Sequence, residues 1–330
     1  MALSLVTGGS GFIGRHLIDT LLSLGDDVRV LDVADPPGAL LQIDFVRGSV
    51  VDRATVERAL DCVDCVYHLA GIAHLWWPAK DDYDLVNRRG TQTVIDAAAR
   101  MGTRRIVHCS TESILLPRRR NGEARVDESA APLLEDMPGP YTRSKFLAER
   151  AALGAARDGL DLVVVNPTVP IGDGDRNMTP PAAMLALFLS GRSLFFLDCV
   201  LNLADVRDVA EGVARAGRHG RAGERYILGG ENRFLRELLP VLERKSGRRM
   251  PRHAVPAPVA VATGIVAEWM ADWLTHRPPV ATREGVALAL RSVPFDCNKA
   301  KNELGYAPRP IDRALTEVVE GFKRDAAGRK

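Results

Sequence analysis

Three glycines at intervals of three residues follow the first apolar run of the chain, residues 3–7, and lead into a helical pattern at 12–24. A glycine permits a tight turn, a second lets a phosphate approach the backbone, and a third lets helix and strand pack closely. The free N–H groups at a helix start favour anions, so this context predicts a pyrophosphate site rather than a plain turn. Its predicted contacts with a dinucleotide are Gly8, Gly11, Phe12, Ile13 and Gly14.

The first half of the chain alternates short apolar runs with longer helical patterns. Such alternation is typical of a parallel sheet covered by helices on both faces, so we expect an α/β fold with a Rossmann, doubly wound sheet. The expected strands are 3–7, 28–33, 43–46, 63–70, 105–110 and 160–166. The expected helices are 12–24, 52–60, 83–101 and 141–157.

The sequence pattern changes after Asn166. Prolines interrupt the alternation of strands and helices, and short helical patterns such as 205–216 and 235–246 dominate. We therefore expect residues 1–166 to form the nucleotide-binding domain, with any final strands supplied by the later part of the chain. Residues 167–330 are expected to form mainly a smaller, mixed substrate domain at the carboxyl edge of the sheet.

Asp32 ends the second predicted strand, 18 residues after Gly14. A carboxylate there can accept hydrogen bonds from both ribose hydroxyls of an adenosine and would repel the extra phosphate of NADP. No arginine follows directly to accommodate that phosphate, although Arg15 and Arg29 are close enough in the sequence to weaken the preference. The sequence favours NAD as the cofactor over NADP.

Tyr141 and Lys145 stand four residues apart, so they share one face of the predicted helix. A free tyrosine has a pKa of about 10, and a neighbouring ammonium is expected to lower that pKa toward the working range of an acid/base catalyst. Alone, the pair would more readily be explained as a chance arrangement on a solvated helix. Thr111 supports the catalytic interpretation because it follows the strand 105–110, where its hydroxyl could hold a substrate oxygen.

Six segments together resemble the extended short-chain dehydrogenase/reductases over nearly the whole chain. Within that group the similarity is to NAD-dependent epimerase/dehydratase and dihydroflavonol-reductase-like proteins, and the stretch from Tyr141 to Asn232 most resembles the hopanoid-associated sugar epimerases. The segments are TGGSGFIG at 7–14, HLAG at 68–71, VNRRGT at 86–91, STE at 110–112, YTRSK (the YxxxK pattern) at 141–145 and NPTVPIG at 166–172.

The resemblance implies a role for several positions. Thr111, Tyr141 and Lys145 match the family's catalytic triad, and Asn87 matches a structural asparagine. The expected cofactor contacts are Ala70 and Gly71 at the adenosine, with Tyr141, Lys145, Asn166, Pro167 and Thr168 at the nicotinamide and its ribose. Many relatives form a homodimer by pairing two long helices, which here would be 83–101 and 141–157.

The chain departs from the family pattern at three places. Gly48-Ser49 replaces the common Gly-Asp after the third strand, which weakens an expected contact with the adenine. Thr111-Glu112-Ser113 replaces the Thr-Asp-Glu of sugar-nucleotide dehydratases, which counts against dehydration. Residues 200–204 bring no arginine to hold a substrate pyrophosphate, which counts against an ordinary nucleotide-sugar substrate.

These observations predict an enzyme that transfers a hydride between NAD and a secondary alcohol or ketone, with Tyr141 as acid/base. An NAD-dependent sugar epimerase, which oxidises its substrate transiently, uses the same residues and stays open. A non-catalytic NAD-binding regulator is a lesser alternative. The substrate is expected to be a sugar derivative or a lipophilic alcohol or ketone; four tryptophans suggest the latter, although such residues more often belong to a core. They are Trp76, Trp77, Trp269 and Trp273.

Composition excludes several other classes. The chain has 44 basic and 42 acidic residues, a balance that does not indicate a nucleic-acid partner. Five cysteines, an odd number, favour a reducing, cytoplasmic location. Cys62 and Cys65 have no second Cys/His pair, so we expect buried thiols and no metal site.

Glu268 and Asp272 interrupt the apolar segment 255–274, so we expect a core or pocket-lining helix there rather than a membrane-surface helix or a stable membrane span.

Overall fold

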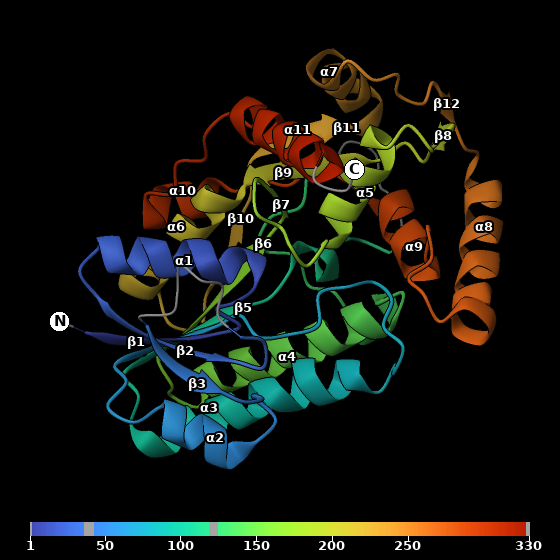
Figure 1. The fold of residues 1–330 in the computed structure, drawn as a ribbon. Coiled ribbons are helices and arrows are strands. Elements are labelled where there is room, and N and C mark those ends of the chain that lie inside the picture. Colours follow the sequence, from blue (N-terminus) through green and yellow to red (C-terminus); the bar gives the residue numbers. More distant parts are fainter. Residues whose placement is uncertain (1, 36–42, 119–124, 328–330) are drawn as a thin grey trace.

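The computed structural model describes residues 2–35, 43–118 and 125–327. Its centre is a seven-stranded, all-parallel sheet in the order β10-β6-β5-β4-β1-β2-β3, flanked by helices on both faces (Figure 1). This arrangement confirms the predicted doubly wound α/β fold. The strands are β1 (Leu3–Thr7), β2 (Asp27–Asp32), β3 (Asp44–Arg47), β4 (Cys65–His68), β5 (Arg105–Cys109), β6 (Leu162–Pro167) and β10 (Arg225–Leu228).

Neighbouring residues of each central strand face opposite layers, so Val6 and Leu5 belong to different cores. One face of the sheet is covered by α1 (Phe12–Ser23), α6 (Val206–His219) and α10 (Asn298–Leu304). The other face is covered by α2 (Arg53–Ala59), α3 (Gly90–Met101) and α4 (Pro140–Arg157). The predicted single helix 83–101 begins as a π-helical segment, η2 (Tyr83–Arg89), and continues as α3.

Strand β10 and helix α6 come from beyond Asn166, yet they belong to the central sheet and its covering layer. β10 pairs in parallel with β6, and α6 packs against α1. The central sheet and its covering layers are therefore assembled from two separate stretches of the chain.

A second lobe lies at the carboxyl edge of the sheet (Figure 1). It contains the three-stranded sheet β11-β9-β7, a two-stranded sheet β12-β8, and a core shared by α5, α7 and α11. The strands are β7 (Val169–Ile171), β8 (Phe195–Phe196), β9 (Val200–Asp205), β11 (Glu231–Phe234) and β12 (His253–Ala254). The helical segments are α5 (Pro180–Leu189), α7 (Leu235–Ser246), α8 (Ala257–Met270), η5 (Ala271–Thr275), α9 (Arg283–Arg291) and α11 (Asp312–Ala327), with short 3₁₀ turns η3 (Glu112–Ile114) and η4 (Leu134–Asp136) before α4.

Of the two alternatives predicted for 255–274, a core helix or a pocket-lining helix, the core helix is wrong. In α8 and η5 only Ala260, Gly264 and Ala271 are buried, whereas Trp269 and Trp273 are 56% and 72% exposed. The reason is that α8 packs along one narrow stripe of small residues against α9, while its apolar surface is far wider than that stripe. Across the described ranges, no helix combines the length and the hydropathy needed to traverse a bilayer.

The prediction that the Cys62 and Cys65 thiols are both buried is wrong for Cys62 and holds in part for Cys65. Cys62 is exposed and has a positive φ of 61° in the turn before β4. Cys65 is half-buried within β4, and burial raises the pKa of its thiol to about 12. In the part of the chain that the structure describes, no three His, Cys, Asp or Glu side chains form a possible metal site. The predicted cytoplasmic location stays a prediction.

Candidate active site

The glycine-rich loop has the shape that a dinucleotide phosphate requires. Gly8 has a φ of +73°, and a Cβ there would lie 2.7 Å from the backbone nitrogen of Ala70. A Cβ on Gly14 would collide with the carbonyl of Gly8, so helix and turn approach as closely as their backbones allow. No side chain caps α1 at Gly11, and its first turn contains no acidic residue. The first N–H groups of α1, near Phe12 and Ile13, are thus free of competing anions, which fits a pyrophosphate.

Asp32 lies beside this loop at the carboxyl end of β2. Its two carboxylate oxygens accept hydrogen bonds from the backbone nitrogens of Ser10, at 2.9 Å, and Ala34, at 3.0 Å. The carboxylate is only partly buried, so further acceptor positions remain for hydroxyl groups. Asp32 therefore anchors the loop and stands where the sequence predicts an adenosine ribose.

Ala70 and Gly71 lie two and three residues beyond the end of β4, and the Ala70 backbone lies against Gly8 of the glycine-rich loop. The Ala70 nitrogen donates to the Thr7 hydroxyl at 3.2 Å, which ends the strand earlier than predicted. Asn87 accepts from the Ile72 nitrogen at 2.7 Å and donates to the Ile72 carbonyl at 3.1 Å. A Cβ at Gly71 would approach this asparagine to 2.9 Å. Asn87 thus has a structural position, clamping the loop after β4.

The three predicted catalytic side chains meet at the carboxyl end of β5. Tyr141 occupies the first turn of α4, is 7% exposed, and lies within hydrogen-bonding reach of the Thr111 hydroxyl. One turn later, the Lys145 ammonium donates to the Cys109 carbonyl at 2.7 Å. The helix therefore brings the phenol and the ammonium to the end of the same strand, next to Thr111.

The pKa of Tyr141 differs from the expectation. Burial raises the pKa of Tyr141 above its ordinary value; the Thr111 hydrogen bond opposes this rise, and the charge of Glu112 adds to it. Burial also lowers the pKa of Lys145. The predicted lowering of the Tyr141 pKa by Lys145 is therefore wrong for the protein alone, because desolvation of the phenol dominates and the ammonium is held on a backbone carbonyl.

Glu112 is a further polar group of the site. In the sequence, this position indicated only that dehydration is disfavoured. The Thr111 hydroxyl donates to its Oε2 at 2.9 Å, and Ser113 donates to its Oε1 at 3.3 Å. Burial raises the pKa of Glu112 to about 7. A carboxyl group that titrates near neutrality is thus bound directly to Thr111.

Asn166 lies at the carboxyl end of β6, and its predicted contact with the nicotinamide stays a prediction. Its side chain is fully buried and donates to the Thr111 carbonyl at 3.0 Å and to Glu149 at 2.7 Å. It therefore supports the backbone that carries Thr111. Pro167 ends β6 at the same edge, and the buried Thr168 hydroxyl donates to the Leu228 carbonyl at 3.4 Å.

Glu284, which the sequence analysis missed, joins the second lobe to α4. Its carboxylate, buried at the start of α9, accepts from the backbone nitrogens of Tyr141 and Thr142. No local signal could reveal this contact, because the partners are more than 140 residues apart in the sequence.

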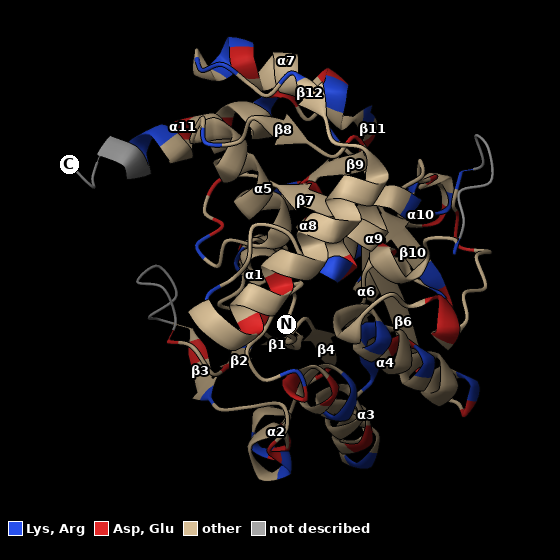
Figure 2. Cartoon of the chain, turned by 90° about the vertical axis from the view of Figure 1, so that its right-hand side faces the viewer, with Lys and Arg blue, Asp and Glu red and all other residues tan. Residues whose placement is uncertain are grey.

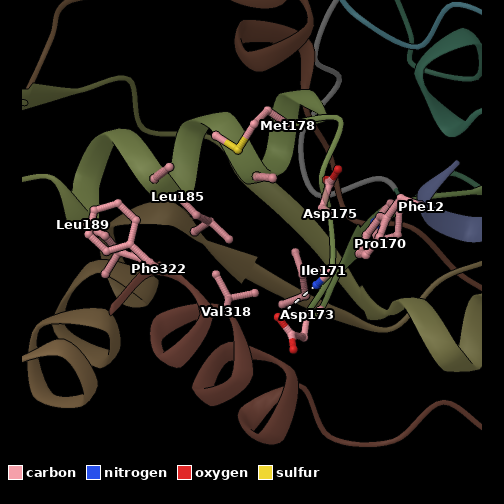
Figure 3. A pocket seen from close by; sticks show the side chains of 15 residues that line it. Phe12, Pro170, Ile171, Asp173, Asp175, Met178, Leu185, Leu189, Val318 and Phe322 are labelled. Atoms are coloured by element: carbon pink, nitrogen blue, oxygen red, sulfur yellow. Dashed lines mark hydrogen bonds between the residues drawn. The ribbon is translucent and has the colours of Figure 1, made fainter. Parts of the chain in front are cut away.

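A small apolar cavity of about 90 Å³ lies between α5, α11 and the loop that follows β7, with Phe12 at one side (Figure 3). Its lining includes Ile171, Leu185 and Val318 but none of the three predicted catalytic residues. It reflects the packing of the second lobe against the start of α1 and is separate from the site at β5.

Comparisons with known proteins agree with this geometry. The profile of the NAD dependent epimerase/dehydratase family matches residues 4–229. The chain is 34% identical to a putative dihydroflavonol 4-reductase of a Synechocystis strain, covering 96% of this chain and 94% of that protein. It is 29% identical to the decarboxylating sterol-4-alpha-carboxylate 3-dehydrogenase of Saccharomyces cerevisiae, covering 96% and 98%.

Among solved structures, the fold is similar to that of the Thermus thermophilus UDP-glucose 4-epimerase in complex with NAD. The TM-score is 0.77 at 24% identity, with 97% of this chain and 99% of that chain covered. The relatives confirm the predicted resemblance and the prediction of an NAD-dependent enzyme. The match over residues 4–229 shows that this chain belongs to the NAD dependent epimerase/dehydratase family.

Proposed function

We propose that this protein is an NAD-dependent oxidoreductase that interconverts a secondary alcohol and a ketone, with Tyr141 as the acid/base. The observation that carries the proposal is the convergence of Tyr141, Thr111 and Lys145 at the carboxyl end of β5, on the sheet edge that also bears the glycine-rich loop. When bound, NAD supplies the carbon that accepts or donates the hydride.

Each residue has a role that its surroundings support. The Thr111 hydroxyl, beside the phenol, orients the substrate oxygen, and Tyr141 exchanges a proton with that oxygen. Lys145, held near the site by the Cys109 carbonyl, faces the same space and serves the nicotinamide ribose. The raised pKa keeps Tyr141 protonated at neutral pH, so the phenol carries the proton that ketone reduction requires.

The substrate class that we propose is a lipophilic ketone or alcohol rather than a nucleotide sugar. Residues 200–204, where a cation for a pyrophosphate is missing, form β9, and Asn202 within it is buried and donates to Asn232 at 2.9 Å. The relatives named as acting on a dihydroflavonol and a sterol support this choice. Asp32 supports NAD over NADP through the repulsion between a carboxylate and a phosphate.

The test is an absorbance assay at the nicotinamide band with lipophilic ketones, their alcohols and nucleotide sugars. Net oxidation or reduction of the cofactor supports the proposal, whereas turnover of a sugar with no net absorbance change would establish the epimerase alternative. Tyr141→Phe is expected to lose turnover by about a hundredfold or more while binding NAD. Tyr306→Phe is the matched control, because the Tyr306 hydroxyl is buried and has no hydrogen-bond partner among the described residues. Binding of NAD with turnover in neither assay would indicate the non-catalytic regulator.

We also propose that the protein is a homodimer that pairs η2–α3 and α4. These helices lie side by side on the outer layer of the sheet (Figure 1), where a second copy could form a four-helix bundle with them. Light scattering during size-exclusion chromatography gives the mass, and a monomer at micromolar concentration would contradict the proposal.

A further inference from the structure

Glu112 lies in the short turn η3, between the end of β5 and the start of α4. Charged residues of both signs occur along outer helices such as α3 and α4 (Figure 2), where water can surround them. Glu112 instead lies half-buried beside Thr111, and within the described ranges no cation pairs with its carboxylate. Its side-chain donors are two hydroxyl groups, those of Thr111 and Ser113. Ion pairing therefore does not explain this carboxyl group.

The Thr111 hydroxyl has a single proton to donate. Its oxygen accepts from the backbone nitrogen of Ser113 at 3.2 Å. Its proton has two acceptors nearby, Glu112 Oε2 at 2.9 Å and the Ser113 hydroxyl oxygen at 3.2 Å. The carboxylate is the stronger acceptor, because hydrogen bonds to charged groups are about twice as strong as neutral ones. Ionised Glu112 therefore holds the Thr111 proton.

This hydrogen bond competes with the role proposed for Thr111. A ketone oxygen has lone pairs only, so it can bind Thr111 only through the Thr111 proton. While Glu112 is ionised, Thr111 offers the ketone a lone pair instead, and the two oxygens repel each other. A neutral Glu112 holds that proton less strongly and can itself donate to the Thr111 oxygen, so the Thr111 proton can turn to the ketone. An alcohol has a proton of its own and can donate to Thr111 in the ionised state.

We infer that Glu112 is a positioning residue whose protonation state sets the direction of the Thr111 hydroxyl, so that the neutral carboxyl permits ketone binding and the carboxylate opposes it. The inference rests on the proposed function, because it concerns the same hydroxyl and the same ketone. Burial raises the pKa of Glu112 to about 7, so both states are populated near neutral pH. Ketone reduction is therefore expected to be faster below this pH than above it.

Three titratable groups face this part of the site from neighbouring helices. Tyr141 faces Glu112 from α4, and its raised pKa keeps it protonated while Glu112 titrates. Lys145, one turn further along α4, donates to the Cys109 carbonyl, and burial lowers its pKa. Glu284 approaches the start of α4 from α9, and burial raises its pKa. Since these groups also respond to pH, the test compares the wild type with a variant in which Glu112 alone cannot ionise.

The test is the pH dependence of kcat/KM for ketone reduction by NADH, from about pH 5.5 to about pH 8.5. For the wild type we expect a fall of about tenfold or more, centred near pH 7, while the KM for NADH changes little. Glu112→Gln keeps a neutral acceptor and an N–H donor at this position. It is therefore expected to equal the wild type at the acidic end and to be about tenfold faster at the alkaline end. A carboxyl group with only a structural role would give a variant that is slower at every pH.

Two further variants sharpen this comparison. Glu128→Gln is the matched control, because Glu128 is also a half-buried carboxyl with a raised pKa but accepts from the backbone nitrogen of Ile227 in β10. Its profile is expected to equal that of the wild type. Ser113→Ala removes one donor to the ionised carboxylate, so it is expected to raise the pKa of Glu112 and move the fall to higher pH. A wild-type profile without the fall, or an equal fall in Glu112→Gln, would overturn the inference.

A second measurement needs no turnover and so separates this inference from the proposed function. In protein labelled with carbon-13 at the glutamate carboxyl groups, the NMR signal of Glu112 is identified by its loss in Glu112→Gln. We expect this signal to titrate near pH 7, and Thr111→Val to raise its midpoint because the carboxylate loses a donor. A midpoint at the ordinary value of a glutamate, or one that Thr111→Val leaves unchanged, would overturn the inference even if ketones are reduced. Thermal melting establishes that the variants are folded.

Discussion

Glu284 Oε1 lies 2.7 Å from the backbone nitrogen of Thr142 and 2.6 Å from its hydroxyl, so a carboxylate from α9 closes the amino terminus of the helix that carries Tyr141. The N-cap residue of this helix, Gly139, has no side chain with which to do so. A carboxylate at this end is favoured by the helix dipole and by two otherwise unpaired N–H groups. The second lobe thereby sets where α4 begins.

Removing this carboxylate is expected to affect both stability and turnover. Glu284→Ala leaves buried N–H groups without an acceptor, so we expect the free energy of unfolding to fall by about 1–3 kcal/mol. Turnover is expected to fall about tenfold while the affinity for NAD changes little, because the glycine-rich loop lies on α1. Denaturant unfolding and steady-state kinetics measure the two effects. Glu268→Ala removes a comparable carboxylate from an exposed backbone nitrogen, and an equal loss of turnover there would refute the specific role of Glu284.

The close approach of backbone at Gly14 predicts a strong effect of one methyl group. Gly14→Ala places a Cβ against the Gly8 carbonyl and within 2.8 Å of the Gly9 Cα, so we expect loss of NAD binding and a lower melting temperature. Gly154→Ala is the matched control, because within the described ranges nothing beyond the adjacent backbone of its own helix lies within 4 Å of a Cβ at this position. This control is expected to stabilise the protein by about 0.5–1 kcal/mol. Equal effects of both changes on NAD affinity, measured by titration, would contradict the packing argument.

Asp32 is expected to decide between the two nicotinamide cofactors. Asp32→Asn keeps an acceptor for the Ser10 nitrogen but removes the charge that repels the extra phosphate. We expect the affinity for NAD to fall about tenfold and the affinity for NADP to rise, so that the ratio of the two dissociation constants shifts by more than tenfold. Parallel titrations with both cofactors give this ratio. An unchanged ratio would mean that Asp32 serves the loop alone.

Glu112 predicts a dependence of stability on pH. Its pKa is raised from 4.5 to about 7 in the folded protein, so the folded state binds more protons than the unfolded state between these values. Stability from this group is therefore lost as the pH rises from about 4.5 to about 7, and the cost persists above pH 7. Glu112→Gln removes the charge, so we expect its melting temperature to exceed that of the wild type by a few degrees at pH 8, roughly 2–4 °C per kcal/mol regained. The two proteins should converge near pH 5, and a constant difference from pH 5 to 8 would refute the assignment.

The parts of the fold that local patterns control could be predicted from the sequence. The helix at Leu235–Ser246 has the predicted bounds, and the first six strands of the sheet lie within about two residues of theirs. The turn of the glycine-rich loop and the start of α1 also follow their prediction, because both depend on residues that are adjacent in the chain. The same holds for Tyr141 and Lys145, whose shared face is a property of one helix.

Features that depend on distant contacts could not be predicted. The contact of Glu284 with α4 depends on the placement of a lobe that no periodicity describes. The exposure of Trp273 was missed for a related reason, since an apolar helix is expected in a core unless something shows how little of it a neighbour covers. The raised pKa of Tyr141 follows from its burial, which spacing alone does not reveal.

The strand order has a consequence for how this protein is made. Until β10 and α6 have left the ribosome, β6 has an unpaired edge, and the side of α1 that later packs against α6 is exposed. At synthesis rates of about 5–20 residues per second, the roughly sixty residues between Pro167 and Leu228 keep the nascent sheet unfinished for several seconds. Ribosome-bound chains of residues 1–167 with a linker long enough to clear the exit tunnel would expose β6 and apolar side chains of α1 to chaperones, whereas chains of residues 1–230 with the same linker would not. The sheet that carries the glycine-rich loop is therefore complete only after β10 has been synthesised, well beyond the first half of the chain.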